Sequence, residues 1–253
     1  MVALKNQDMG FFNLKHIKHL FARKKWMKEA IVFLLFGLLY KTSRYIAIGD
    51  VETAFSNAIK VIAIEKNMGF FWEQTIQAIF LKHTTLIKVL NTFYLYVHIP
   101  ATLLFFIWLF KRYNHKYRLV RNGFIAANCV ALVFFIVYPC APPRMLSQYG
   151  FSDTLLDISG VNLYSGVYSG LLNQYAAVPS MHFGNAFLIA VVVFIYAKDS
   201  YLKYGIMLYP LFVLLVIVIT GNHFFIDAII GGCIVILPYF FMKQGNNAYF
   251  YQK

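Results

Sequence analysis

Six stretches of about twenty nearly uncharged residues recur along this chain, and they constrain its fold more than any other feature. They fall at about 30–48, 86–110, 122–140, 183–197, 204–220 and 226–242. Each is close to the ~20 residues that a helix needs to cross the ~30 Å hydrocarbon core of a bilayer. Only 13% of the 253 residues are charged, against about 25% in a typical soluble domain. The sequence therefore predicts an all-α, polytopic membrane protein built as a bundle of six transmembrane helices.

Positive charge is concentrated in alternate connections between these stretches. Sixteen of the 23 Lys and Arg residues lie at 1–29, 111–121, 198–203 and 243–253, whereas the intervening segments hold more acidic than basic residues. Lys and Arg are enriched on the cytoplasmic side of membrane proteins. We therefore expect a plasma or inner membrane protein with both termini in the cytoplasm. Topology accounts for the net charge of +13, and the absence of any binding motif argues against a nucleic-acid partner.

The chain divides into a basic tail at 1–29, a membrane domain at 30–242 and a short tail at 243–253. Within the membrane domain, the segment 50–85 is too polar to span a bilayer, but apolar residues recur at helical spacing at Val51, Phe55, Ala58, Ile59 and Ile62. This pattern predicts an interfacial amphipathic helix that ends near Gly69, and a helix packed over the spans fits it equally well. The segment 141–180 is longer than a plain connection requires and is predicted to be an outer loop.

The cysteines indicate neither a disulfide framework nor a metal site. Cys129, Cys140 and Cys233 lie in or beside apolar stretches and show no paired spacing. The sequence also lacks a Walker lysine and a magnesium-binding carboxylate cluster. We therefore expect no cofactor and no metal, although two histidines and an aspartate described below could in principle bind zinc.

Three short segments carry the groups that could perform chemistry, and the predicted topology puts them at one membrane face, the non-cytoplasmic one. They are 138–144 (YPCAPPR), 178–182 (VPSMH) and 221–227 (GNHFFID). A charged residue at membrane depth costs at least ~2.5–3.5 kcal/mol, so such residues usually pair with one another or line a wet cavity. The three segments are therefore predicted to form one site.

His223 and Asp227 are four residues apart and share a face on a helix. The carboxylate can then accept the proton of the imidazole Nδ1, which leaves Nε2 free as a nucleophile or general base. A purely structural hydrogen bond is the alternative for such a pair. The other two segments favour the chemical interpretation.

The middle segment predicts an anion-binding helix end. Ser180 is a plausible N-cap, so the first turn after it would point unpaired amides and His182 at a phosphate. Arg144 follows two prolines, and its planar guanidinium suits bidentate contact with phosphate. Arg44, at the outer end of the first stretch, could add a second cation, although snorkelling to headgroups explains it as well.

Together, Pro-Pro-Arg at 142–144, Ala-Ala-Val-Pro-Ser-Met-His at 176–182 and Gly-Asn-His-Phe-Phe-Ile-Asp at 221–227 resemble the type-2 phosphatidic acid phosphatase superfamily. The resemblance is to its inositolphosphotransferase-like branch, which is related to inositol phosphorylceramide synthase. It implies that His223 attacks phosphorus, that Asp227 orients it and that His182 protonates the leaving group. Ser180 and Arg144 correspond to the anion-binding residues.

The chain departs from the best-known phosphatases of that superfamily in three ways. Ile217 stands where they have an Arg six residues before the last-motif histidine, and Met181 stands where they have Gly. Their Lys-x6-Arg-Pro motif is missing, and Pro-Pro-Arg is its nearest counterpart. One phosphate-binding cation is thus left for Arg144 or Arg44 to supply.

The resemblance implies a metal-independent lipid phosphate phosphatase or phosphotransferase that works through a phosphohistidine, with a membrane lipid phosphate as substrate and the bilayer as its setting. Water as acceptor makes it a phosphatase, and an alcohol makes it a transferase. The alternative is a proton-coupled transporter or flippase with a relay through His223, Asp227 and His98. Clustering of the charged groups at one face, and the lack of an inverted repeat, argue against the transporter.

Overall fold

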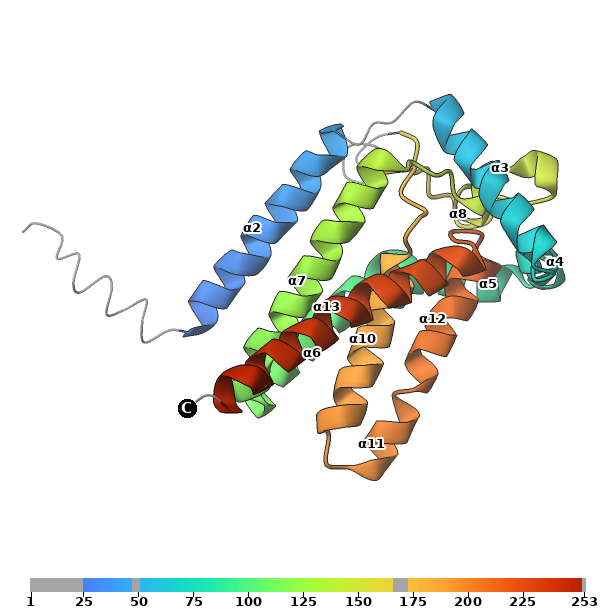
Figure 1. Ribbon diagram of the computed structural model, residues 1–253. Coiled ribbons are helices and arrows are strands. Elements are labelled where there is room, and N and C mark those ends of the chain that lie inside the picture. The colour runs from blue at the N-terminus through green and yellow to red at the C-terminus, as the bar shows by residue number, and fades with distance from the viewer. Residues whose placement is uncertain (1–24, 47–50, 166–172, 252–253) are drawn as a thin grey trace, which may run out of the picture. The chain divides into compact units, whose positions relative to one another are not determined.

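The structure is a computed structural model that describes residues 25–46, 51–165 and 173–251, with side chains described at all of these except 25, 40–46 and 242–251 (Figure 1). Every regular element in this part of the chain is a helix. The predicted all-α class is therefore confirmed. The chain divides into two compact units, 1–42 and 43–253. Most of α2 (Lys25–Ile46), which overlaps the first predicted span at residues 30–46, belongs to the first unit.

Three helical segments of the second unit are long and apolar enough to cross a bilayer. The first, Thr84–Arg112, consists of α5 (Thr84–Thr92), the π-helix η1 (Phe93–Val97) and α6 (His98–Arg112). The second is α7 (Asn114–Val137), and the third, Ser200–Ile219, contains α11 (Ser200–Gly205) and α12 (Leu208–Ile219). Two shorter apolar helices are α10 (Met181–Tyr196) and the Phe225–Phe241 part of α13 (Phe225–Tyr251). These segments coincide with the last five predicted stretches.

The helices α7, α10, α12 and α13 pack side by side, and α13 contacts both α7 and α10 (Figure 1). Glycines allow the α10–α13 contact to be unusually close. A Cβ added to Gly184 would lie 2.7 Å from the carbonyl oxygen of Gly231, and one added to Gly231 would overlap the carbonyl of Ser180. Backbones that approach this closely leave no room for a side chain, which explains why glycine occupies both positions.

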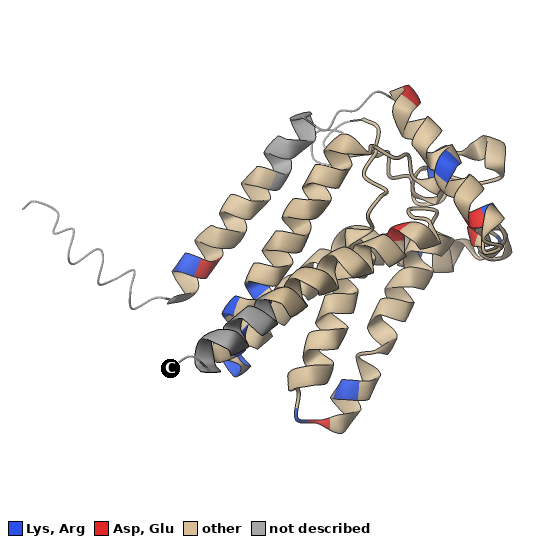
Figure 2. Ribbon diagram, in the orientation of Figure 1, with Lys and Arg blue, Asp and Glu red and all other residues tan. Residues whose placement is uncertain are grey.

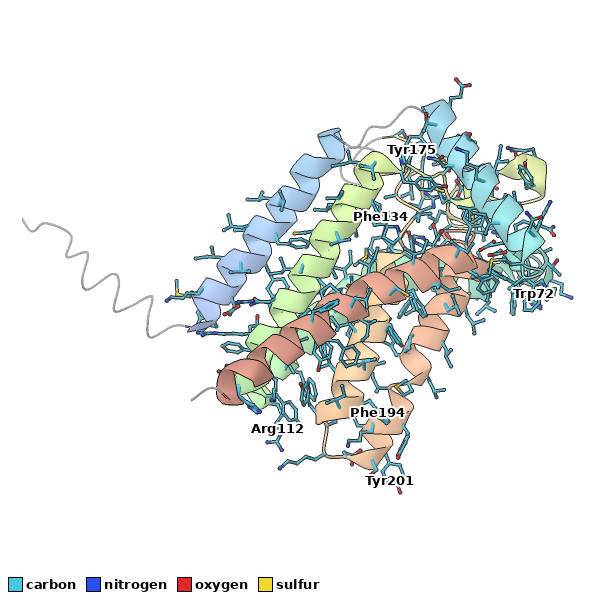
Figure 3. The ribbon with its side chains drawn as sticks, viewed as in Figure 1. Trp72, Arg112, Phe134, Tyr175, Phe194 and Tyr201 are labelled. Atoms are coloured by element: carbon cyan, nitrogen blue, oxygen red, sulfur yellow. The ribbon has the colours of Figure 1, made fainter. Side chains whose placement is uncertain are left out.

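Chain direction brings the chemical segments to one end of the bundle. The C-terminal end of α7, the N-terminal end of α10 and the connection from α12 to α13 lie together, opposite the connections α6–α7 and α10–α11. Figure 2 shows charged residues near the helix ends and few between them. In Figure 3, Arg112 and Tyr201 lie at the far end of the bundle from Tyr175 and Trp72. The site therefore sits at the end remote from the basic connections.

The predicted amphipathic segment forms two helices, α3 (Val51–Asn67) and α4 (Glu73–Phe80). The sequence predicted that the helix ends near Gly69, and Gly69, with φ of +78°, lies in the turn that follows α3. The interior face of α3 carries Ala58, Val61 and Ile62, which pack against Cys140, Leu146 and Phe224 among others. The helix thus packs over the protein, and two residues of the predicted apolar stripe, Val51 and Ile59, are exposed instead.

The described part of the segment between α7 and α10 consists of short helical turns, with a backbone bridge near its two ends. It contains η2 (Pro143–Met145), η3 (Ser147–Tyr149) and α8 (Thr154–Asp157). The backbone of Cys140 bonds to that of Tyr175 and Ala177 on either side, with N–O distances of 2.8 and 3.2 Å. The beginning and the end of this predicted outer loop are thereby held together beside the site.

Candidate active site

His223 is buried in the connection from α12 to α13, and one of its ring nitrogens has a defined partner. Its Nδ1 lies 2.8 Å from the carbonyl oxygen of Ala177. A carbonyl only accepts hydrogen bonds, so Nδ1 carries the proton and Nε2 bears the free lone pair. The tautomer is the one predicted from the sequence, but a backbone carbonyl of the middle motif provides the closest contact.

Asp227 contributes a second contact to the same nitrogen. Its Oδ2 lies 3.4 Å from the His223 Nδ1 and accepts a hydrogen bond of 2.9 Å from the amide of Phe224. The carboxylate is fully buried, at 0% exposure. Asp227 therefore closes the turn that holds His223 and also supplies negative charge beside the ring. The backbone carbonyl of Asp227 accepts a bond of 2.9 Å from the Ser180 amide, which ties this motif to the middle one.

The N-terminal end of α10 places His182 beside His223, with ring centroids 5.9 Å apart. Ser180 is the N-cap predicted from the sequence, and its hydroxyl accepts from the Phe183 amide at 3.5 Å. The amides of Met181 and His182, at the first two helical positions, precede the hydrogen-bond ladder of the helix and project from its end. This helix end has the polarity that favours an anion.

Arg144 is buried, with 7% of its surface exposed, and it is hydrogen-bonded to the last motif. Its amide donates to the carbonyl of Gly221 at 2.7 Å, and its Nη1 donates to the side-chain oxygen of Asn222 at 2.6 Å. On the other side, the Arg144 Nε lies 3.9 Å from Asp153, which also accepts a hydrogen bond from the Tyr164 hydroxyl. Burial and that bond raise the pKa of Tyr164 to about 12.

The structure thus brings together five of the six predicted site residues: His223, Asp227, His182, Ser180 and Arg144. The sixth, Arg44, lies outside the residues whose side chains are described. Among the described residues, no group of three His, Cys, Asp or Glu side chains could hold a metal ion.

A third histidine, His98, lies behind His182, and the sequence analysis gave it no role in phosphoryl transfer. The two ring centroids are 5.0 Å apart, and the Tyr94 ring stacks on His182 at 4.2 Å. The His98 Nδ1 bonds to the Tyr209 hydroxyl at 3.0 Å. The π-helix η1 directly precedes His98, and such turns are frequent at functional sites. A π-helical turn leaves little trace in the sequence pattern.

Two buried glutamates, Glu65 and Glu73, are the other residues that the sequence analysis missed. Glu65 accepts from the amide of Ile226 and Glu73 from that of Phe225, both at 2.8 Å. Burial, with the neighbouring Glu73 carboxyl, raises the pKa of Glu65 to about 9, and burial also raises the pKa of Glu73. From the sequence, both residues are interpreted only as two of the acidic residues of a polar segment. No spacing or motif around them indicates that their side chains are buried.

His182, His223 and Arg144 thus lie at one end of an apolar helical bundle. The comparison with known families specifies the class. Residues 59–241 match the PAP2 superfamily, and the chain belongs to that superfamily of metal-independent lipid phosphatases and phosphotransferases.

The chain is also similar to an individual curated protein. Phosphoinositol dihydroceramide synthase of Bacteroides thetaiotaomicron is 26% identical over 166 residues, which cover 58% of this chain and 52% of that protein. The chain therefore spans about half the length of this relative. No solved structure matches the chain.

Proposed function

We propose that this protein transfers a phosphoryl ester from a membrane lipid to an acceptor hydroxyl through a covalent intermediate on His223. The observation that carries the proposal is the His223 ring itself. Its Nδ1–H is committed to the Ala177 carbonyl, so Nε2 is the available nucleophile, and His182 lies beside it.

In the first half of the reaction, Nε2 of His223 attacks the lipid phosphorus and forms an N–P bond. The P–O bond to the leaving alkoxide breaks, and His182 gives its proton to that oxygen. Asp227 stabilises the positive charge that develops on the His223 ring, because its carboxylate lies 3.4 Å from Nδ1. The products are the free alcohol and a phosphohistidine.

In the second half, the acceptor hydroxyl attacks phosphorus while His182, now neutral, takes its proton. The N–P bond breaks, and His223 returns to its starting tautomer. Both histidines are then restored, so the cycle requires no external proton donor. Water as acceptor completes a hydrolysis, and an alcohol completes a transfer.

Arg144, Ser180 and the first-turn amides of α10 stabilise the charge on the equatorial phosphate oxygens. Positioning and electrostatic stabilisation are the main contributions that a protein makes to such a loose transition state. The Asn222 contact holds one guanidinium nitrogen of Arg144, so its planar fork is preoriented. Arg44 is the candidate for a second cation at the same site.

The name of the Bacteroides relative supports a phosphoinositol lipid as donor and a ceramide-type alcohol as acceptor. We propose the same chemical class for this chain. The proposed topology has six spans, both termini in the cytoplasm, an interfacial α3–α4 segment and the site at the outer face. It is supported by the position of the site at the end of the bundle remote from the basic connections.

The test uses purified protein and a panel of phosphatidates, prenyl phosphates and phosphoinositides, with and without acceptor alcohols. His223→Ala should abolish turnover and the radiolabelled phosphohistidine, while the exposed His115→Ala serves as the matched control. EDTA should leave turnover unchanged, and vanadate should inhibit it by occupying the phosphate position. Turnover retained by His223→Ala would refute the assignment.

A further inference from the structure

The first turn of α13 directly follows His223, and three successive amides there are held by carboxyl groups. Asp227 accepts from Phe224, Glu73 from Phe225 and Glu65 from Ile226, at 2.9, 2.8 and 2.8 Å. These amides belong to the set that a helix leaves without intrahelical partners. The carboxyls therefore occupy a helix end that would otherwise attract an anion, which leaves the end of α10 for the substrate phosphate.

Glu65 and Glu73 reach this turn from outside the bundle. Glu65 lies near the end of α3 and Glu73 begins α4, and the turn at Gly69 brings the two helices back to the same point. Both side chains are at 0% exposure. The α3–α4 hairpin thus contacts the nucleophile segment through two charge-bearing groups in addition to its apolar residues.

The two glutamates form a pair that needs a proton. The Glu73 carboxyl lies near that of Glu65 and, together with burial, disfavours its ionisation. The Oε2 atoms of both side chains are buried and have no hydrogen-bond partner among the described residues. Two neighbouring buried carboxylates repel each other when both are ionised, whereas a proton on one of them removes the repulsion and gives it a hydrogen to donate to the other.

We propose that Glu65 and Glu73 are positioning residues that share one proton and hold the first turn of α13, and through it His223 and Asp227, in the catalytic geometry. The inference rests on the proposed function of His223. It assigns a role to the α3–α4 hairpin, which contains none of the three motif segments.

The surroundings of the pair make its protonation sensitive to pH. Asp227 of α13 is the ionisable group of another element that acts on Glu65, and Tyr138 and Cys140 belong to the segment that packs on α3. Burial raises the pKa of both Tyr138 and Cys140, so both stay neutral near neutral pH and add no further negative charge there. Loss of the shared proton puts a second negative charge into the buried pair and repels it from Asp227.

The first experiment compares Glu65→Gln and Glu65→Ala with Glu52→Gln, the exposed glutamate of the same helix. Gln keeps an acceptor for the Ile226 amide and needs no proton, so kcat should stay close to that of the wild type at neutral pH. Ala removes the contact, and a displacement of His223 by about 1 Å should lower kcat about 100-fold with a smaller change in KM. Wild-type kcat in Glu65→Ala would overturn the proposal.

The pH dependence gives a readout that a merely structural role would not move. The ratio of the Glu65→Gln kcat to the wild-type kcat should rise as the pH approaches 9, the pKa of Glu65. Titrations that both enzymes share, such as that of His182, cancel in this ratio. Glu52→Gln should show a constant ratio. A constant ratio for Glu65→Gln as well would overturn the proposal.

A stability measurement separates this inference from the proposed function, because it requires no turnover. The native state retains the Glu65 proton up to a pH of about 9, whereas the unfolded chain loses it near 4.5. The contribution of Glu65 to the free energy of unfolding should therefore be fully present below pH 4.5 and be lost as the pH rises toward 9. The unfolding midpoint of Glu65→Gln in detergent should fall less over that range. Equal slopes for the two proteins would overturn the shared proton even if the enzyme proved inactive on every lipid tested.

Discussion

The backbone contact between α10 and α13 makes Gly231→Ala the most informative single substitution. Its new Cβ would overlap the Ser180 carbonyl oxygen and lie 2.9 Å from the carbonyl carbon, where ordinary contacts are 3.4–4 Å. Both atoms belong to backbone, so no side-chain rotation relieves the overlap. The two helices must therefore separate, by a distance on the order of 1 Å, as overpacked sites do.

The expected magnitude combines opposing contributions. Overpacking costs about 1–3 kcal/mol, and replacing a helical Gly with Ala returns about 1 kcal/mol through helix propensity. The net loss of stability should be about 0–2 kcal/mol, so the variant should still fold. Activity should fall about 100-fold. Ser180 carries the amide that bonds to the Asp227 carbonyl, so a shift of about 1 Å at this contact misaligns the reacting groups.

Gly232→Ala is the matched control, because it makes the same chemical change at the next residue. Its Cβ would lie 3.2 Å from the Phe183 ring edge, the far end of a side chain that can rotate. The helix-propensity gain is the same, so stability should be unchanged or slightly raised and activity retained. The assay is lipid-phosphate turnover together with the thermal midpoint of each purified variant. Equal activity in the two variants would refute the reasoning from the close contact.

Three further substitutions test the guanidinium of Arg144 and the helix cap at Ser180. Arg144→Lys keeps the charge but loses the planar fork that Asn222 preorients, so we expect a 10- to 100-fold drop in kcat/KM, about 1.4–2.7 kcal/mol, in a lipid turnover assay; an unchanged kcat/KM would show that charge alone is sufficient. Ser180→Ala should lower the free energy of unfolding by about 0.5–1 kcal/mol, since the cap distance of 3.5 Å is long, and Ser180→Thr should restore it in thermal unfolding. Equal midpoints for Ser180→Ala and the wild type would show that the hydroxyl does not cap α10.

Much of the architecture was predictable because membrane-spanning helices are recognisable in a sequence by their length and hydrophobicity. The last five predicted stretches each coincide with a helical segment, and Ser180 and Gly69 perform the local roles that their residue types predicted. The convergence of His223, His182 and Arg144 followed from topology. Successive helices of the bundle run in opposite directions, so every second connection between them lies at the same end. These are consequences of local chemistry and chain direction.

The parts that sequence could not supply depend on long-range contacts. The Ala177 carbonyl is the closest partner of His223, yet every residue has a carbonyl, so no sequence pattern identifies it. Nothing in the sequence indicates that Glu65 and Glu73 are buried. The turn at Gly69 brings both side chains to the backbone amides at the start of α13, with which they form hydrogen bonds. The exposed positions of Val51 and Ile59 depend likewise on which face of α3 meets the rest of the protein.

The backbone bridge of Cys140 to Tyr175 and Ala177 also determines what can be exchanged between relatives. Both ends of the intervening segment are bonded beside Ala177, whose carbonyl accepts the hydrogen bond from the His223 Nδ1. Chain between these ends can be exchanged with little effect on His223 only where the exchange keeps Arg144 and the contacts of Ser152 with Gln77 and of Thr154 with Thr220. Chimeras that keep these contacts would test whether the segment between the two ends determines which headgroup is accepted.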